Sequence, residues 1–350
     1  MDVRLSPEQR ALRDSAVQVV DRLAPAAVRD LDDTERLAKL DAAVEASGWR
    51  ELRAASSPGQ GPLASAVEAA IVAEELGRGL ADAAFLGPTL AADLRRLAGA
   101  TPSASRETVA LVPDLSAPAG ATGDGPGPGA VAIDARGSTA ALVLLPVAGG
   151  HALAEVALPV VPGPPGGMDL TRPGVPVEQG ARPVGVAGER ALGAADLEAW
   201  SALGLGLACA DLVGTMAGAI RLACDYARSR RQYGAAIGSF QAVQHMLADA
   251  YVATEGSRSV ALYAAWGVDA LPAGEALAAA ALAKAYCSRA ARTVCEVAIQ
   301  VHGGIGNTWD CLAHVYLRRA LLSIDLLGGV GPNLARVLEH HGIGGSDGLR

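Results

Sequence analysis

Apolar residues recur at the spacing of a helical stripe through the first hundred residues of the chain. The segment Ser6-Pro7-Glu8-Gln9 precedes the first stripe and supplies an N-cap, a proline for the first helical position and a capping-box partner. The pattern therefore predicts a helix that begins at Pro7. Similar stripes predict a second helix over residues 33–47, ended by Gly48, and a third after the polar loop 56–61.

The pattern changes after residue 105, where short β-prone runs alternate with turns rich in glycine and proline. The runs are residues 108–112, 140–145 and 156–161. They predict a small antiparallel β-domain. We expect the Gly/Pro-rich segments 120–129 and 163–167 to be flexible loops.

Helical periodicity returns near residue 196. The long apolar or amphipathic stretches are 196–229, 240–266, 272–301 and 309–327. Asp196 is expected to cap the first of them, and four such helices in sequence indicate a bundle. The order of elements predicts an α+β fold with an N-terminal α-helical domain (1–104), an abbreviated middle β-domain (105–195) and a C-terminal four-helix bundle (196–350).

Composition narrows the classes of function. The formal net charge of −8 and the lack of a Lys/Arg cluster argue against nucleic acid as a partner. Apolar residues make up 51% of the 350 residues, and much of this share is alanine, which raises the mean hydropathy without requiring a membrane. The most apolar window, 201–220, contains Asp211 and recurring glycines, so we expect a buried bundle helix rather than a membrane span.

Five cysteines without metal-ligand spacing predict free thiols, no metal site and a reducing compartment, the cytoplasm. The first residues contain no apolar run of the kind that a signal peptide needs, so none is expected.

The stretch 300–310 separates two helical patterns and has three glycines in four residues. We expect Thr308 to cap the following helix and Asp310 to lie in its first turn. A carboxylate beside a glycine-rich turn suits a general base if it faces a substrate cavity. The alternative is a helix-start carboxylate that complements the helix dipole.

A second stretch, 226–245, adds to this picture. Together the two stretches resemble two signatures of the acyl-CoA dehydrogenase family: Arg-x-Gln-aromatic-Gly followed by Ile-Gly-x-Phe-Gln, and Gln-x-x-Gly-Gly-x-Gly ending in an acid. The matching residues of the first are Arg230, Gln232, Tyr233, Gly234, Phe240 and Gln241, and those of the second are Gln300, Gly303, Gly304, Gly306 and Asp310. The order of domains is also that of the family, so the resemblance extends over nearly the whole chain and is most specific in its last 150 residues.

This resemblance implies an FAD-dependent oxidoreductase that desaturates an acyl-CoA thioester by α-proton abstraction and β-hydride transfer to flavin. It implies that Asp310 is the base, and that Arg230 binds the pyrophosphate of a neighbouring subunit's FAD, with Gln232 and Tyr233 in the same motif. Gln300, Gly303 and Gly304 correspond to positions that contact that same FAD, and Phe240 and Gln241 lie near its adenine. The implied partners are the acyl-CoA substrate, an electron-transfer flavoprotein or similar acceptor, and further subunits in a homo- or hetero-oligomer, a dimer of dimers.

Some features depart from the family pattern. The family's Thr-Glu-Pro-x-x-Gly-Ser motif, which holds the flavin ring, is not visible between residues 105 and 195. Asp310 is one methylene shorter than the usual glutamate, and Leu327-Gly328-Gly329-Val330 stands where the family has Tyr-Glu-Gly-Thr. The short subunits of heterotetrameric acyl-CoA dehydrogenases from actinobacteria are similar in this respect.

These observations support three hypotheses. The chain is a catalytic subunit of an FAD-dependent acyl-CoA dehydrogenase, or a non-catalytic subunit that completes a partner's FAD site, or a helical protein that binds an acyl thioester without redox chemistry.

Overall fold

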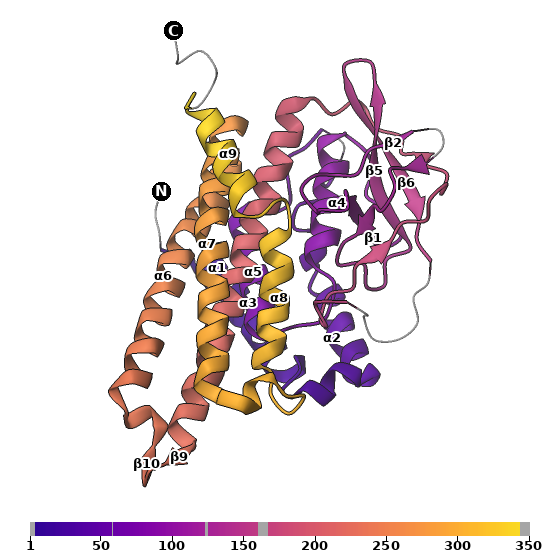
Figure 1. The fold of residues 1–350 in the computed structure, drawn as a ribbon. Coiled ribbons are helices and arrows are strands. Elements are labelled where there is room, and N and C mark those ends of the chain that lie inside the picture. The colour runs from indigo at the N-terminus through magenta and orange to yellow at the C-terminus, as the bar shows by residue number, and fades with distance from the viewer. Residues whose placement is uncertain (1–3, 58, 123–124, 160–166, 344–350) are drawn as a thin grey trace.

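The computed structural model describes residues 4–57, 59–122, 125–159 and 167–343. Helices come first, a sheet follows, and a second set of helices completes the fold (Figure 1). The first helices are α1 (Pro7–Leu23), α2 (Thr34–Ala46), α3 (Ala66–Arg78) and α4 (Leu86–Leu97). The strands are β1 (Glu107–Leu111), β2 (Ala121–Thr122), β3 (Gly125–Pro126), β4 (Val131–Ala132), β5 (Ala140–Val147), β6 (Gly150–Ala157), β7 (Val175–Pro176) and β8 (Val184–Gly185).

The C-terminal part is a helical bundle. Its helices are α5 (Ala194–Ser229), α6 (Gln241–Ala270), α7 (Ala273–His302), α8 (Ala313–Asp325) and α9 (Val330–His340). A small hairpin, β9 (Arg231–Gln232) and β10 (Ala235–Ala236), and the 3-10 turn η3 (Ile237–Ser239) join α5 to α6. A second 3-10 turn, η4 (Gly303–Asn307), follows α7. The predicted order of an α-helical domain, a small sheet domain and a C-terminal helical bundle is confirmed.

Helix starts follow from local sequence in some places and not in others. At α1, Ser6 Oγ accepts a hydrogen bond from the Gln9 amide at 3.1 Å, and the Ser6 amide donates to Gln9 Oε1 at 3.0 Å, which confirms the capping box. The prediction that Asp196 caps α5 is wrong. Gly193 holds the N-cap position, and the Asp196 carboxylate reaches back from the first turn to accept from the Gly193 amide at 2.8 Å.

The sheet is mixed rather than antiparallel. Its strand order is β7-β4-β1-β5-β6-β8. The hairpin of β5 and β6 is antiparallel, but β1 runs parallel to β5. The prediction of an antiparallel domain is wrong for this pair because β4 returns along the other edge of β1, so the chain enters β5 in the direction of β1.

The predictions of the third strand and of the two loops in this domain hold only in part. The third β-prone run was expected at 156–161, whereas β6 ends at Ala157. Short strands β2 and β3 lie within the expected loop 120–129, although residues 123–124 are outside the described part of the chain. Most of the expected loop 163–167 also lies outside it.

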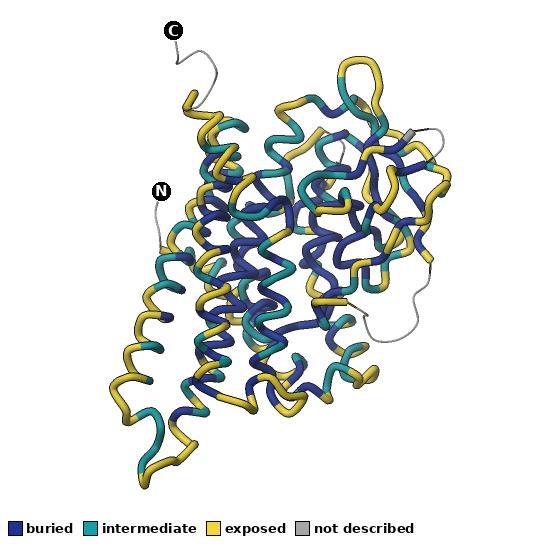
Figure 2. The backbone as a smooth tube through the Cα atoms, viewed as in Figure 1, coloured by how far each residue is buried: buried dark blue, intermediate teal, exposed yellow. Residues whose placement is uncertain are grey.

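Helix α5 is the central helix of the bundle (Figures 1 and 2). Its most apolar window is 94% buried inside the protein, as expected for a bundle helix. Glycines bring α3 against it: a Cβ on Gly214 would lie 1.8 Å from the carbonyl oxygen of Glu74, and one on Gly77 would lie 2.5 Å from that of Asp211. Trp200 Nε1 donates to the Leu90 carbonyl of α4 at 2.9 Å. Helix α5 therefore holds the N-terminal helices in place.

Lys284 of α7 is fully buried and joins α7 to the end of α8. Its Nζ donates to the backbone carbonyls of Ile324, Leu326 and Gly328 at 2.8, 2.9 and 3.1 Å. Carbonyls at the end of a helix lack intrahelical partners, so the ammonium group satisfies them. Burial lowers the pKa of Lys284 to about 8.

We predict that Lys284→Met lowers the free energy of unfolding at pH 7 by about 2–4 kcal/mol, because it leaves buried carbonyls without a donor. The folded protein binds the ammonium proton of Lys284 less firmly than the unfolded chain does. The contribution of Lys284 to stability therefore rises with pH above 8. The gap between wild type and variant should therefore widen by roughly 2 kcal/mol from pH 8 to pH 10. Urea unfolding measures both values. Lys39→Met is the control, since Lys39 and Lys284 are the two lysines of the chain and Lys39 is exposed; an equal loss in both variants would contradict the account.

Candidate functional site

The residues that carry the sequence motifs lie together at one end of the bundle (Figure 1). The ends of α5 and α7 adjoin, since the rings of Tyr226 and His302 stack with centroids 4.6 Å apart. Arg230 caps the C-terminus of α5 four residues after Tyr226, and Gly303 and Gly304 follow His302 directly. Two motifs that are about seventy residues apart in sequence therefore meet on one surface.

The hairpin of β9 and β10 projects beyond the bundle (Figure 1). Its turn has positive φ at Tyr233 (+52°) and Gly234 (+77°), the conformation for which hairpins usually select Asn-Gly. Left-handed backbone is unfavourable for a bulky residue, and Tyr233 is also 94% exposed. The ring of Tyr233 faces the ring of Phe240 edge-on, with the two ring centroids 6.3 Å apart. An aromatic side chain held in solvent on a costly turn indicates a contact surface.

Four polar side chains at this end of the bundle have no partner in the described part of the chain. Within the described residues, the side chains of Arg230, Gln232, Gln241 and Gln300 form no hydrogen bond or ion pair, and all four residues are exposed. The structure therefore brings the predicted cofactor-contacting residues to one exposed surface, where a guanidinium and three amides are available to a ligand.

The structure gives a different answer for each of the three glycines after α7 to the question of why a side chain is absent there. Gly303 has φ +65° and ψ −144°, a conformation that only glycine adopts readily. Gly306 is required by packing, since a Cβ there would lie 2.9 Å from the Ile299 carbonyl oxygen. Gly304 has neither reason: its backbone is ordinary, and nothing lies within 4 Å of a Cβ built on it. Its lack of a side chain leaves an open approach to the backbone of the loop.

Asp310 lies on this same end but not in a helix. The helix α8 begins at Ala313 with Leu312 at its N-cap position, so the prediction that Thr308 caps it and places Asp310 in its first turn is wrong. Thr308 Oγ1 instead accepts from the Asp310 amide at 3.3 Å within the turn. Residues 308–312 form a bend and a turn before the helix. The local sequence does not distinguish this turn from a helix cap. Asp310 is exposed.

A pocket lies at the junction of the three parts of the fold, far from Asp310. It is lined by α4, the sheet domain and the second half of α8, where Leu322 and Leu326 face it. The rise of a helix puts Leu326 about 20 Å along the axis from Ala313. Asp310 therefore does not reach this pocket in its own chain. The pocket has a volume of about 180 Å³, below the roughly 300–1,000 Å³ of sites for drug-sized ligands.

Beside this pocket lies a buried network of charges, which we call the Asp211 network. Arg319 Nη2 donates to Asp211 Oδ1 at 2.7 Å, and Arg172 Nη1 donates to Asp211 Oδ2 at 3.2 Å. Arg172 Nε also donates to Asp169 Oδ2 at 2.9 Å, and Ser323 Oγ donates to Asp211 Oδ2 at 2.7 Å. All five residues are buried. The network therefore joins α5 and α8 to the segment that follows the sheet's central strands.

The electrostatics of this network are balanced. Burial disfavours the charged carboxylate of Asp211, but the guanidinium groups of Arg172 and Arg319 outweigh burial and hold its pKa below the ordinary value. Burial opposes the charge on Arg172 as well, and the carboxylates of Asp211 and Asp169 outweigh it and raise its pKa. Sequence reasoning missed the network. The one available signal was a carboxylate, Asp211, within an apolar window.

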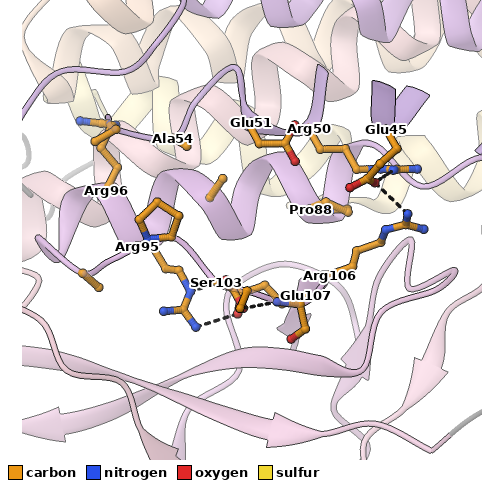
Figure 3. Close-up of a pocket in the computed structure, with 16 residues that line it drawn as sticks. Glu45, Arg50, Glu51, Ala54, Pro88, Arg95, Arg96, Ser103, Arg106 and Glu107 are labelled. Atoms are coloured by element: carbon orange, nitrogen blue, oxygen red, sulfur yellow. Dashed lines mark hydrogen bonds and ion pairs between the residues drawn. The ribbon is translucent and has the colours of Figure 1, made fainter. Parts of the chain in front are cut away.

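Another pocket lies between α4 and the approach to β1, and charged side chains line it (Figure 3). Arg106 Nη2 lies 2.9 Å from Glu45 Oε2, and Arg95 pairs with Glu107. Because these arginines are already paired with carboxylates, the pocket is an ion-paired junction between the N-terminal helices and the sheet.

Comparison with known proteins extends these observations. Residues 205–329 match the family model described as acyl-CoA dehydrogenase, C-terminal domain. Acyl-CoA dehydrogenase IpdE2 of Mycolicibacterium smegmatis is 36% identical over 131 residues, which cover 37% of this chain and 40% of that protein. Acyl-CoA dehydrogenase FadE27 of Mycobacterium tuberculosis is 31% identical over 223 residues, which cover 61% of this chain and 57% of that protein.

Solved structures match over the whole chain. A chain of the ChsE4–ChsE5 complex from Mycobacterium tuberculosis has a TM-score of 0.74 and 26% identity, and the match covers 98% of this chain and 99% of that chain. Residues 205–329 therefore resemble the C-terminal domain of the acyl-CoA dehydrogenases, and the whole chain has the fold of these enzymes. The FAD complex of PigA shares this fold, with a TM-score of 0.70, 19% identity and coverage of 98% of this chain and 100% of that chain.

Within this acyl-CoA dehydrogenase fold, the motif residues Arg230, Gln300 and Gly304 all belong to the matched domain. Asp211 and Arg319 of the buried network belong to it too, whereas Arg172 does not. The chain spans less than two thirds of the length of IpdE2 and FadE27 in these matches, so the likeness is strongest in the bundle.

We predict that Asp211→Asn lowers the free energy of unfolding by about 3–5 kcal/mol, because it leaves two buried guanidinium groups without their shared carboxylate. Asp225→Asn on the same helix is the matched control. Its carboxylate is exposed and pairs with Arg228 at 3.1 Å, so its loss should cost less than about 1 kcal/mol. Denaturant unfolding measures both. A small effect at Asp211 would mean that the network does not hold the bundle to the sheet domain.

Proposed function

We propose that this chain is a subunit of an FAD-dependent acyl-CoA dehydrogenase, and that the end of its bundle completes the FAD site of a neighbouring subunit. When bound, FAD accepts the β-hydride of an acyl-CoA thioester. The observation that carries the proposal is Gly304, whose open surface no feature of the described chain explains, at the same end of the bundle as the unpaired Arg230.

The residues at this end of the bundle fit the charged part of FAD. The guanidinium of Arg230 suits a pyrophosphate, which it can bind through two hydrogen bonds. The missing side chain at Gly304 lets an anion approach the backbone of η4 closely. Gln300 adds an amide on the same surface, and the exposed rings of Tyr233 and Phe240 offer faces for an adenine. We propose that these residues, with Gln232 and Gln241, bind and orient the cofactor.

The interior of the chain supports a division of roles between subunits. The pocket of about 180 Å³ beside the Asp211 network has little room for a flavin ring and an acyl chain. Leu327, the first residue of the segment that stands where the family has Tyr-Glu-Gly-Thr, is buried and apolar. The Thr-Glu-Pro-x-x-Gly-Ser motif is not present between residues 105 and 195 either. We therefore propose that a different subunit holds the flavin ring.

Exposed apolar residues on the outer helices support assembly with other subunits (Figure 2). They include Tyr251, Val252 and Tyr263 on α6, Leu282 and Tyr286 on α7, and Leu334 and Leu338 on α9. Large apolar side chains gathered on adjoining helices are typical of subunit interfaces. We propose a hetero-oligomer, a dimer of dimers in the cytoplasm, with an electron-transfer flavoprotein or a similar protein as the electron acceptor. A homo-oligomer is the second candidate.

Asp310 has two assignments within this proposal. It is the base for the site shared with the neighbour, or it is a turn residue while the neighbour supplies the base. A base for an α-proton gains strength from apolar surroundings, and the exposed position of Asp310 in the single chain favours the second assignment.

We predict that the chain purified alone holds well under one FAD per subunit, and that co-expression with its partner subunit produces a yellow complex with bound FAD. The reason is that the chain offers contacts for the pyrophosphate and adenine but little room for the flavin ring. The absorbance spectrum, measured against protein concentration, gives the FAD content. One FAD per subunit in a homo-oligomer would contradict the division of roles, and no flavin in any complex would favour an acyl-thioester-binding protein without redox chemistry.

Arg230→Ala should weaken FAD binding by the complex roughly ten- to a hundredfold, which corresponds to the loss of about 1.5–3 kcal/mol from a charge-assisted contact. Arg228→Ala is the matched control, because Arg228 is also exposed, lies two residues away and pairs with Asp225. Titration of the apo-complex with FAD, followed by flavin fluorescence, measures the affinities. Equal affinities in the two variants would show that Arg230 does not bind the cofactor.

For Asp310→Asn we predict turnover within a few-fold of wild type, because the partner supplies the base. A loss of several orders of magnitude, with FAD and fold retained, would instead identify Asp310 as the base. In that case Asp310→Glu should keep or raise activity, since glutamate restores the reach that is usual in the family. Stopped-flow reduction of the complex by acyl-CoA measures the rate for each variant.

A further inference from the structure

The pocket beside the Asp211 network has a buried carboxylate in its wall, and the proposed function assigns this pocket no ligand. The carboxylate is that of Asp134, two residues after β4. Its Oδ2 accepts hydrogen bonds from the backbone amides of Phe85 and Gly87 at 2.7 and 3.4 Å. Its Oδ1 is buried and has no hydrogen-bond partner among the described residues. Because Asp134 is only 6% exposed, bulk water does not replace the missing partner.

The direction of the Asp134 side chain is fixed by its backbone and by α4. Its φ is +46°, a left-handed conformation that aspartate tolerates better than most residues. The two amides that bind Oδ2 stand at the start of α4, where helix amides lack intrahelical partners. Helix α4 approaches this closely because Gly87 has no side chain: a Cβ there would lie 2.6 Å from the Ile133 carbonyl oxygen. A rotation of the carboxylate would therefore break two bonds at the start of α4.

The other charged side chains in the wall of this pocket are already paired. Arg172 donates to Asp169 and Asp211, and its Nη2 donates to Ser323 Oγ at 2.7 Å. The rest of the wall is mainly apolar and includes Leu86, Val131, Ile133, Leu322 and Leu326. Among the described side chains of the wall, Asp134 Oδ1 is therefore the hydrogen-bond acceptor that remains for a ligand.

The size and the charges of the pocket define the kind of ligand. An apolar cavity of about 150 Å³ is large enough to hold benzene, so a volume of about 180 Å³ suits one ring with a small substituent. A buried acceptor without a partner is unfavourable, and a donor on the ligand removes that cost. A cationic donor would lie in the same pocket as the Arg172 guanidinium, so a neutral hydroxyl group is favoured.

We propose that this pocket is a binding site for a small neutral molecule, an apolar ring or short hydrocarbon that carries one hydroxyl group. The hydroxyl donates to Asp134 Oδ1, and the apolar part packs against the leucines of α4 and α8. The site is separate from the surface around Arg230 and Gly304, because Leu326 in its wall follows the end of α8 that is remote from the glycine loop.

The test uses the purified full-length chain at pH 7 and two probes of similar size: phenol, which donates a hydrogen bond, and benzonitrile, which only accepts one. Calorimetric titration measures the two affinities. We expect wild type to bind one phenol per chain, about tenfold more tightly than benzonitrile. Asp134→Asn keeps an oxygen for the amides of Phe85 and Gly87 and places an NH₂ group where Oδ1 was. Phenol should then bind about tenfold more weakly than to wild type, and benzonitrile more tightly.

Two further variants locate the binding. Leu322→Phe adds volume inside the pocket and should weaken the binding of both probes at least about tenfold, whereas Asp225→Asn lies on exposed surface and should change neither affinity. Circular dichroism shows that each variant is folded. The proposal is overturned if folded wild type binds neither probe saturably, since the pocket then holds only water. It is also overturned if Asp134→Asn shifts both affinities in the same direction or shifts neither.

Discussion

The structure depends most on a single buried carboxylate, Asp211, at the middle of its central helix. Two arginines from outside that helix, Arg172 and Arg319, share it. Without Asp211, the buried guanidinium of Arg319 would have no carboxylate among the described residues and that of Arg172 would keep only Asp169, so the position of α8 and of the segment around Arg172 is tied to α5. Arg319 Nη1 also donates to the Ala81 carbonyl, which links the N-terminal helices to the same point.

Sequence reasoning was successful where the determining contacts are local. The capping box at Ser6 and Gln9 involves residues three apart, and the helical stripes reflect a repeat that a single helix satisfies. That the two motifs lie at one end of the bundle also agrees with the resemblance, which implies that Arg230 and Gly304 contact one cofactor. The start of α8 was not predicted, because Thr308 bonds within a turn instead of capping the helix.

Contacts between distant segments were the part that sequence could not supply. Asp211 and Arg319 are 108 residues apart, and nothing local distinguishes Arg319 from an exposed arginine on an amphipathic helix. The direction of β1 relative to β5 depended on the route of the chain through β4. The role of each glycine also needed coordinates: a Cβ on Gly306 would clash with the Ile299 carbonyl oxygen, whereas a Cβ on Gly304 would meet nothing within 4 Å.

The central claim is that the outer end of the bundle serves a neighbour's cofactor while the interior does not hold a flavin ring. An experimental structure of the co-purified hetero-oligomer tests this claim most directly. The account predicts FAD with its pyrophosphate against Arg230 and the backbone at Gly304, and with its flavin ring held by the partner subunit. A flavin ring between α8 and the sheet domain of this chain, with Arg230 away from any cofactor, would contradict it.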